Sequence, residues 1–506
     1  MEIALKARHG SNGRSKRFSS IGQLATPGPP VKEYDVIAIG TGSVMHIIDG
    51  MIQREPDIQA AVIDKDEPGG ICMTRGCVPS KILLYPAEVI RTTERAGLFG
   101  IDARVQNVDF GQVMGRMRSL IDADMARIER GLTESENIEY YHEEAHFVEP
   151  YTMEVAGETI RSDRIFLGAG SEPTIPPIEG LEEVGYLTSD TFLHITELPP
   201  ATAVIGGGFI AAEYGHFLAA MGSKVTILGR NPQFLPKEEP EISALAKREL
   251  GKHMTILTNH EVRAAREDGG KKVLVAVDRE SGKERTVTAD KILVAAGRGP
   301  TTHRLHPEKG GIETDDRGWI VVDEHLQTSQ SNVYALGDAL GRHHFKHTAN
   351  YEATVAYYNA VLKHETHPDY HAIPHAVFTY PEIAGAGMGE KEAVAEYGEA
   401  KVGIGFYRYE DTAKGEAMAV KDYFVKIIID PETYALLGAH IIGPQASVLI
   451  QEVINLMYTE ERSALPIVNG MHIHPALSEV VERALWTILT PEQYQHTLHH
   501  HGLSVA

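Results

Sequence analysis

Cys72 and Cys77 lie close together in the stretch GGICMTRGCVPSK and are the only two cysteines among 506 residues. Two such thiols can form a structural disulfide, supply two ligands of a metal site, or alternate between dithiol and disulfide. A disulfide that closes so short a loop removes little chain entropy, and an iron–sulfur cluster needs thiolates that this chain lacks. A zinc site completed by histidines is the remaining alternative, but the pattern favours reversible redox chemistry.

The residues after Cys77 predict a helix that would activate such a thiol. Pro79 is typical of a first helical turn, and KILLYPAEVIRTTERA (81–96) has the spacing of an amphipathic helix with a kink at Pro86. The N-terminus of a helix is the positive end of its dipole, which lowers the pKa of a thiol and makes the thiolate available for exchange.

The composition indicates a globular chain of three or four domains with 42% apolar and 23% charged residues. The net charge of −22 argues against a nucleic-acid partner and against binding to anionic lipid. No apolar run has the length of a membrane span. Two cysteines exclude a disulfide-rich secreted scaffold, so a reducing cytoplasmic compartment is expected.

Residues 1–33 differ from the rest of the chain because they are basic, rich in Ser and Gly and without periodicity, and they end in TPGPP (26–30). We predict a disordered extension here. The alternative is an organelle transit peptide, since basic residues outnumber acids over this stretch. The basic residues are Lys6, Arg8, Arg14, Lys16 and Arg17.

The stretch YDVIAIG (34–40) predicts the first strand of a dinucleotide-binding βαβ unit. Gly40 allows the tight turn, and Gly42 lets the backbone approach a pyrophosphate at the helix N-terminus. A second strand, AAVIDK (60–65), places Asp64 where a ribose-binding acid belongs. Met45 occupies the position at which the pattern has Gly or Ala, so helix and strand must be spaced differently here.

A second such unit occupies ATAVIGGGFIAAEYGHFLAAMGSKVTILGR (201–230), with Gly206, Gly208 and Ala211 at the fingerprint positions. Its second strand ends in Gly229 and Arg230, where an NAD-binding unit would have an acid. An arginine there can pair with a 2′-phosphate, which favours NADPH over NADH. Two dinucleotide units around a dithiol suggest FAD as the bound cofactor and NADPH as the hydride donor.

At this point the sequence resembles the pyridine nucleotide–disulfide oxidoreductases over residues 34–490, most of all the mycothione reductase and dihydrolipoamide dehydrogenase branches. GGICMTRGCVPSK resembles the active-site stretch of this family, and TSQSNVYALGD (328–338) resembles its second flavin motif. HIHPALSEVVERAL (472–485) resembles its C-terminal signature, and AAGRGP (295–300) resembles a strand end near the nicotinamide domain.

The resemblance implies an α/β fold with two Rossmann-like dinucleotide-binding domains, for FAD and NAD(P), and a C-terminal α+β dimerisation domain. The expected FAD-binding domain comprises residues 34–185 and 310–372. The NAD(P)-binding domain comprises 186–309, and the interface domain comprises 373–506. Family members are homodimers whose active sites combine both chains.

The resemblance also implies roles for the redox residues. Cys77 would be the thiolate beside the flavin, and Cys72 would be the outer thiolate that attacks a small disulfide. Two sulfurs are needed because one forms a mixed disulfide with the substrate and the other resolves it. His474 of the partner subunit would protonate the leaving thiolate. Glu479 would hold the other ring nitrogen of that histidine.

The same resemblance implies two further catalytic residues, Lys81 and Glu213, and several cofactor-binding residues. Lys81 would lie near the flavin and pair with Glu213, and Asp338 would contact the ribityl chain, with Gly337 leaving room for it. Gly70 is expected at the FAD and Gly297 at the NAD(P), and no metal ligand is expected.

The first hypothesis is therefore an FAD-dependent reductase that uses NADPH to reduce a low-molecular-weight disulfide. The alternative is dihydrolipoyl dehydrogenase, which would use NAD and work with a lipoyl-domain partner. A mercuric reductase would need a second, C-terminal cysteine pair, which this chain lacks. A flavoprotein that binds without turning over disulfides is a hypothesis of another class.

Overall fold

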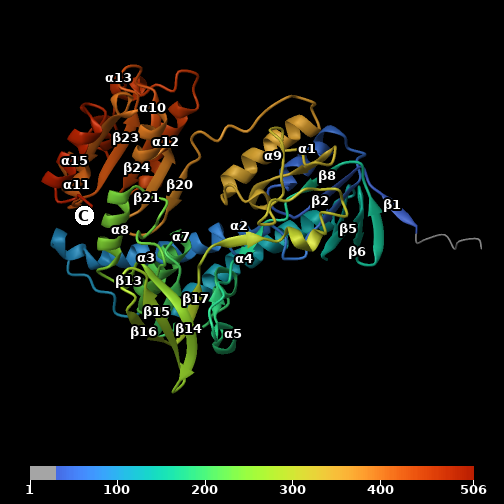
Figure 1. Cartoon of the computed structure of the whole chain (residues 1–506), viewed down its shortest axis with the longest axis horizontal. Helices are drawn as coiled ribbons and strands as arrows, with labels where there is room; N and C mark the ends of the chain where they lie inside the picture. Colours follow the sequence, from blue (N-terminus) through green and yellow to red (C-terminus); the bar gives the residue numbers. More distant parts are fainter. Residues whose placement is uncertain (1–29, 506) are drawn as a thin grey trace, which may run out of the picture.

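The computed structural model describes residues 30–505, which form three lobes, each with its own main sheet (Figure 1). The first lobe contains a parallel sheet with the strand order β19-β8-β2-β3-β4. Every side chain of β2 and β3 is buried, as expected for a parallel sheet that is covered on both faces. The strands are β2 (Val36–Ile39), β3 (Ala60–Ile63), β4 (Ile138–Tyr141), β8 (Ile165–Leu167) and β19 (Val333–Ala335), and helices α1 (Met45–Arg54) and α9 (Lys346–Ala360) pack side by side on this lobe.

A second layer in the first lobe consists of the antiparallel strands β5 (Ala145–Glu149), β6 (Thr152–Val155) and β7 (Glu158–Arg161). Residues Val31–Glu33 extend this layer as strand β1, which pairs in parallel with β7. The prediction of a disordered segment was wrong for these three residues. Their side chains are all exposed, so no apolar pattern marks the strand. Backbone pairing holds these residues, together with the ion pair between Lys32 and Glu139 of β4. Residues 1–29 of the predicted extension lie outside the described residues.

The second lobe contains a parallel sheet with the strand order β10-β17-β11-β12-β13. An antiparallel meander of three strands packs beside it and ends in the hairpin at the bottom of Figure 1. The parallel strands are β10 (Leu187–Thr188), β11 (Ala201–Ile205), β12 (Lys224–Leu228), β13 (Thr255–Leu257) and β17 (Lys291–Val294). The meander is β14 (His260–Asp268), β15 (Lys271–Asp278) and β16 (Glu284–Ala289), and the helices are α7 (Phe209–Met221) and α8 (Pro240–Leu250).

Two long helices connect the first lobe to the second. Helix α3 (Cys77–Glu94) follows the short helix α2 (Gly70–Thr74) and packs against both α4 (Phe110–Thr133) and α7. Asp109 caps α4, because its side chain accepts the backbone N–H of Gln112 at 2.9 Å. Since α3 begins at the edge of the first lobe and packs on the second, its N-terminus lies between the two nucleotide-binding units.

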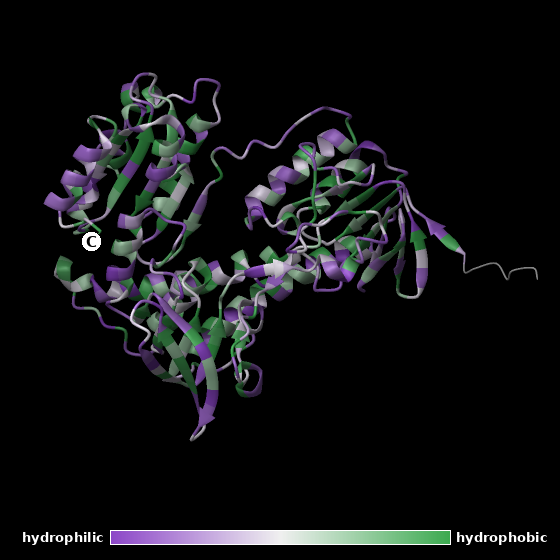
Figure 2. Cartoon of the chain, in the orientation of Figure 1, coloured by the Kyte–Doolittle hydropathy of each residue, from purple (hydrophilic) through white to green (hydrophobic). Residues whose placement is uncertain are grey.

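The third lobe is an antiparallel sheet with the strand order β20-β21-β24-β23-β22-β25 and flanking helices. Its central strands are among the most hydrophobic segments of the chain (Figure 2). The strands are β20 (His375–Val377), β21 (Ile383–Gly387), β22 (Gly403–Arg408), β23 (Phe424–Ile429), β24 (Leu436–Ile442) and β25 (Ile488–Leu489). The helices are α10 (Glu390–Tyr397), α11 (Ala413–Ala417), α12 (Ala446–Met457), α13 (Leu465–Asn469), α14 (Glu479–Ala484) and α15 (Pro491–His500).

One apolar cluster joins the second and third lobes, whereas the first lobe has a cluster of its own. The connection 361–374 runs from α9 to β20 across the top of Figure 1. The predicted fold class is confirmed, with two parallel α/β units and a C-terminal α+β unit. The domain boundaries that the resemblance implies stay a prediction. Among residues 30–505, no helix is long and apolar enough to span a bilayer.

The shorter elements lie mainly in the connections. They are β9 (Ser171–Pro173), which pairs with β18 (Arg298–Pro300), the helices α5 (Leu181–Val184) and α6 (Ser189–Phe192), and the 3-10 turns Ala96–Phe99, Thr302–Leu305, Gly337–Leu340, Glu399–Lys401 and Tyr409–Asp411.

Candidate active site

A cavity of about 610 Å³ lies where the first two lobes meet, and both cysteines line it. Cys72 lies in α2, and Cys77 is the first residue of α3, at the positive end of the helix dipole. Both are free thiols in this structure. Gly76 lets the chain fold back between them, since a Cβ at this position would lie 2.9 Å from the carbonyl oxygen of Ile71.

The two thiols differ in acidity. The hydrogen bond that Cys72 donates to Cys77 raises the pKa of Cys72 far above its usual range, and burial adds to this effect. The same hydrogen bond, assisted by the Lys81 ammonium, lowers the pKa of Cys77 to about 7. When the pair is ionised, the negative charge therefore resides on Cys77, and the remaining proton resides on Cys72.

Lys81 lies one turn after Cys77 on α3 and pairs with Glu213 of α7, with its Nζ 2.9 and 3.0 Å from the two carboxylate oxygens. Glu213 is buried and also accepts the backbone N–H of Phe378 from the third lobe at 3.0 Å. The Lys81 ammonium lies 4.7 Å from the centre of the Phe378 ring. The second and third lobes thus both contribute to the contacts that hold this lysine beside Cys77.

The first dinucleotide unit forms one wall of the cavity. Gly40 adopts a φ of +97°, and a Cβ there would collide with the carbonyl oxygen of Gly168. Gly42 and Gly70 face each other, because a Cβ on Gly70 would lie 2.7 Å from the Cα of Gly42. The structure places Asp64 at the end of β3, where its carboxylate accepts the backbone N–H of Thr41 at 2.8 Å.

Asp338 and Gly337 line the same cavity and lie in the turn after β19. The carboxylate of Asp338 accepts the hydroxyl of Ser171 at 2.5 Å. Arg298 donates to that hydroxyl from Nε at 2.6 Å, and its side chain is largely buried. The sequence pattern AAGRGP drew attention to Gly297, with a φ of +131°, whereas Arg298 is the residue that lines the cavity.

The second dinucleotide unit has the expected backbone geometry. Gly206 has a φ of +140°, and a Cβ on it would collide with the carbonyl oxygen of Ala295. Gly208 precedes the first turn of α7, and Ala211 is fully buried in that helix. Arg230 follows β12 with an exposed side chain that forms no ion pair within residues 30–505. Its backbone carbonyl accepts Nη1 of Arg279 at 2.9 Å.

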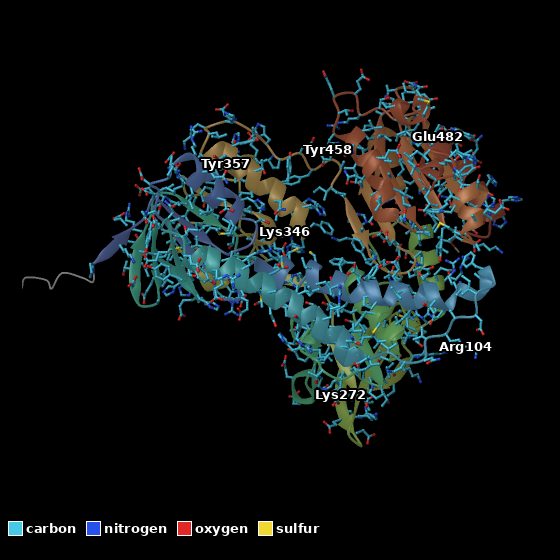
Figure 3. The ribbon with its side chains drawn as sticks, turned by 180° about the vertical axis from the view of Figure 1, so that it is seen from behind. Arg104, Lys272, Lys346, Tyr357, Tyr458 and Glu482 are labelled. Atoms are coloured by element: carbon cyan, nitrogen blue, oxygen red, sulfur yellow. The ribbon has the colours of Figure 1, made fainter. Side chains whose placement is uncertain are left out.

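His474 and Glu479 form the predicted pair, with Nδ1 of the histidine 2.9 Å from a carboxylate oxygen of Glu479. Arg483 donates to the same oxygen at 2.9 Å, and the backbone N–H of Ala476 donates to the other at 3.1 Å. The hydrogen bond with His474 lowers the pKa of Glu479. Within one chain this pair is not part of the cysteine cavity: in Figure 3, Glu482 of the same helix α14 lies far from Lys346.

Lys346 is a cavity residue to which the sequence assigned no role. It begins α9, and its Nζ donates to the hydroxyl of Ser43 at 2.9 Å. Burial lowers the pKa of Lys346, and the two thiols oppose this effect. Lys346 in turn lowers the pKa of Cys72, so each cysteine has a lysine of its own, Lys81 for Cys77 and Lys346 for Cys72. This arrangement is visible only in the folded chain, where residue 346 lies near residue 72.

Comparison with known proteins agrees with this geometry. The family model of the pyridine nucleotide-disulphide oxidoreductases matches residues 34–356, and the model of their dimerisation domain matches residues 373–485. The chain belongs to this family. It is therefore a flavin-dependent oxidoreductase of a family that uses FAD and a pyridine nucleotide, and it carries the dimerisation domain of that family.

Two curated relatives cover nearly the whole chain. The mycothione reductase of Mycobacterium tuberculosis is 36% identical over 467 residues, which are 90% of this chain and 99% of the relative. The dihydrolipoyl dehydrogenase of Chlamydia muridarum is 30% identical over 464 residues, which are 90% of this chain and 97% of that relative. The HOCl-induced flavoprotein disulfide reductase RclA from Escherichia coli has a similar structure, with a TM-score of 0.78, 25% identity, and coverage of 90% of this chain and 100% of that one.

Proposed function

We propose that this chain reduces a low-molecular-weight disulfide with electrons from NADPH, in the manner of a mycothione reductase. The observation that carries the proposal is the polarised pair of thiols in one cavity with two lysines. A structural disulfide needs neither a thiol of lowered pKa nor an adjacent cation, whereas thiol exchange needs a thiolate, which both of these features favour.

The residues of the cavity fit FAD. Gly40, Gly42 and Gly70 leave a cradle that side chains would fill, and Asp64 and Asp338 lie at two separate points of the same cavity. The bound FAD would accept a hydride from the nicotinamide and supply two electrons to the cysteine pair. Lys81 and Lys346 would provide positive charge along the path of these electrons.

The thiol–disulfide exchange itself would be carried out by the two cysteines. After deprotonation, the sulfur of Cys72 attacks one sulfur of the substrate, forming a mixed disulfide and releasing the first product as a thiolate. The thiolate of Cys77 then attacks the sulfur of Cys72, which closes the Cys72–Cys77 disulfide and releases the second thiolate. Because Cys72 holds the proton in the resting pair, the reaction needs a base, and the released thiolates need an acid.

We assign both proton transfers to the partner subunit's His474. The exposed position of His474 suits this role, since its side chain is 66% exposed in the single chain while Glu479 fixes Nδ1 and leaves Nε2 free. Large apolar residues beside it are also exposed, with Met471 fully exposed and Ile473 78% exposed. Such a surface is expected to be covered by a second copy of this chain.

Arg230 supports NADPH as the electron donor. Its guanidinium follows β12, where the ribose-binding acid of an NAD site would lie, and among the described residues it has no carboxylate partner. A cation without a counter-charge at this position is suited to a 2′-phosphate.

The test compares NADPH and NADH as donors for wild type, Arg230→Ala and the control Arg263→Ala, an exposed arginine on β14 of the same lobe. Loss of a charge-assisted contact should raise the KM for NADPH in Arg230→Ala about tenfold or more and leave the KM for NADH unchanged. Arg263→Ala should behave like wild type. A strong NADH preference that is the same in wild type and in Arg230→Ala would contradict the proposed donor.

Dihydrolipoyl dehydrogenase is the second candidate, because a relative with that activity is 30% identical over the same 90% of the chain. This enzyme would use the same cysteines with NAD and would act on a lipoyl-domain partner. A kinetic panel of mycothiol, glutathione, coenzyme A and lipoamide disulfides separates the two candidates. Preference for lipoamide in this panel, together with oxidation of dihydrolipoamide with NAD⁺ as the acceptor, would favour the second.

A further inference from the structure

Three side chains that can bind a metal lie together on the first lobe, outside the cysteine cavity. Ligand atoms of Glu324, His325 and His367 lie within 4.8 Å of one another. Nε2 of His325 is 3.9 Å from one carboxylate oxygen of Glu324, and Nδ1 of His367 is 4.0 Å from the other. The two imidazole rings lie with their centres 4.6 Å apart. None of these residues has a role in the redox site.

A hydrogen bond to a backbone carbonyl fixes the ring orientation of His325, as is usual for metal-binding histidines. Its Nδ1 lies 3.2 Å from the backbone carbonyl of Thr366, which can only accept a hydrogen bond. Nδ1 therefore carries the proton, and the lone pair of Nε2 faces Glu324 and His367. A carbonyl that holds the distal nitrogen of a ligand histidine is the usual outer partner of a metal site.

The two segments that carry the ligands are clamped together by Asn359, a buried residue of α9. Its Nδ2 donates to the carbonyl of His325 at 3.0 Å and to the carbonyl of Thr366 at 2.8 Å. Its Oδ1 accepts the backbone N–H of Thr366 at 2.9 Å. The backbone next to each histidine is thus held in place, although the histidines are 42 positions apart (367 − 325).

Two of the three side chains must move closer before all three can bind one ion, and these two are the more exposed ones. Zinc with nitrogen and oxygen ligands at about 2.0 to 2.2 Å needs ligand atoms about 3.4 Å apart, so Glu324 and His367 have to close by roughly 1 Å. Their side chains are 76% and 53% exposed, whereas that of His325 is 31% exposed. Rotation of two exposed side chains toward one fixed histidine completes the arrangement.

The second group of this kind in the described part of the chain behaves differently. Glu239, Glu241 and Glu390 also converge, but the ammonium of Lys426 lies among them and supplies the counter-charge, 2.7 Å from both Glu241 and Glu390. No lysine or arginine pairs with Glu324 within residues 30–505. The histidine cluster therefore combines an acid and two nitrogen donors, and no lysine or arginine in the described part of the chain supplies the counter-charge.

We propose that Glu324, His325 and His367 bind one divalent transition metal ion of the zinc type, with water completing the sphere. Two imidazoles and one carboxylate are donors that suit Zn²⁺, Co²⁺ and Ni²⁺ rather than Mg²⁺ or Ca²⁺. The ion ties the connection 361–374, which leads to the third lobe, to the turn that carries Glu324 and His325 on the first lobe. This site is independent of the proposed redox function.

The test titrates the FAD-loaded enzyme with Zn²⁺ by calorimetry and with Co²⁺ by its visible absorbance. The variants are His367→Ala, the double variant His325→Ala/His367→Ala, and the control His364→Ala, which lies in the same connection but outside the cluster. All carry the same cysteines and the same terminal histidines 499–501, so differences between variants report this cluster alone.

Wild type and His364→Ala should bind one more Zn²⁺ per chain than the double variant, and His367→Ala should weaken that site at least tenfold. Zn²⁺ should also slow proteolysis within 361–374 in wild type and not in the double variant. Because the side chain of His367 is about half exposed, its replacement removes little packing beyond the contact with His325. Equal stoichiometry and affinity in wild type and both cluster variants would overturn the proposal.

Discussion

At the level of single residues, the chemistry depends on how the charges around Cys77 balance. The Lys81 ammonium lowers the pKa of Cys77, while the Glu213 carboxylate, which holds Lys81 in place, raises it. The Cys72 hydrogen bond has the largest effect, and the result is a pKa of about 7. Cys77 is thus close to half ionised at neutral pH, while Cys72 stays protonated.

This balance predicts opposite shifts in two variants. In the reduced protein, the rate of Cys77 alkylation by iodoacetamide should rise with pH around an inflection at about 7. Lys81→Met should move the inflection to higher pH, and Glu213→Gln should move it to lower pH. Peptide mass spectrometry measures the rate at each cysteine. Shifts of the same sign in both variants would show that packing, and not charge, controls this thiol.

The sequence alone was sufficient to propose site residues that lie close together in the chain or that match the spacing of a known motif. Cys77 and Lys81 share a helix turn, and His474 and Glu479 are five positions apart (479 − 474). Lys346, Ser171 and Arg298 could not be assigned in this way, because they reach the cavity from three separate segments. Their partners are determined by tertiary packing and have no periodic signal in the sequence.

At the level of elements, α9 links the cavity to the core of the first lobe through Glu352. This residue is 1% exposed, accepts the backbone N–H of Gly337 at 2.6 Å and accepts the hydroxyl of Tyr370 at 2.7 Å. It therefore positions the turn that carries Asp338. Burial raises the pKa of Glu352 to about 7.

This raised pKa predicts a pH-dependent loss of stability. The folded state holds a proton that the unfolded state releases near pH 4.5, so the stability from this group is complete below that pH and falls as pH rises to about 7. Glu352→Gln should remove this slope and raise the free energy of unfolding at pH 8 by about 1 to 3 kcal/mol. Thermal unfolding from pH 5 to pH 8 measures both effects. An unchanged slope in the variant would contradict the assignment.

The contact between α8 and the third lobe depends on Lys426, whose side chain is 0% exposed. It pairs with Glu239, Glu241 and Glu390, and these carboxylates raise its pKa against the effect of burial. Removal of the lysine leaves buried carboxylates without a counter-charge.

Lys426→Met should therefore lower stability by about 3 to 5 kcal/mol. The matched control is Lys421→Met, an exposed lysine just before the same strand, which should change stability by less than about 0.5 kcal/mol. Thermal and urea unfolding of both variants provide the comparison. Similar midpoints for the two would indicate that the buried cluster does not stabilise the contact.

The sequence predicted the parallel units well, because strands such as Val36–Ile39 and Lys224–Leu228 are buried, apolar and followed by glycine turns. It did not predict β1, because Val31, Lys32 and Glu33 have exposed side chains and form no apolar pattern. The meander β14–β16 was also missed, since its outer strands β14 and β16 are polar and have few buried positions to reveal a period.

At the level of the whole molecule, the single chain separates the cysteines from His474, and the proposed reaction requires a dimer. The sites of a symmetric dimer would each combine the cysteines of one subunit with the histidine of the other.

Co-expression of Cys72→Ser and His474→Gln chains tests this arrangement. Each homodimer should be inactive toward disulfides, whereas a heterodimer contains one site with intact cysteines and an intact histidine. With random pairing, half of the dimers are heterodimers, and each heterodimer has one intact site of two. About a quarter of wild-type activity should therefore return. No recovery, with heterodimers shown to form, would place the cysteines and the histidine of one site in the same chain.

The central claim is that Cys72 and Cys77 are a redox pair reduced by a pyridine nucleotide, and a thiol count tests it most directly. Because the chain has only these two cysteines, anaerobic denaturation and alkylation count them without ambiguity. The air-oxidised, FAD-loaded enzyme should show no free thiol, and the same enzyme after NADPH addition should show two. An equal thiol count before and after reduction, together with full disulfide reductase activity in Cys72→Ser, would contradict the account.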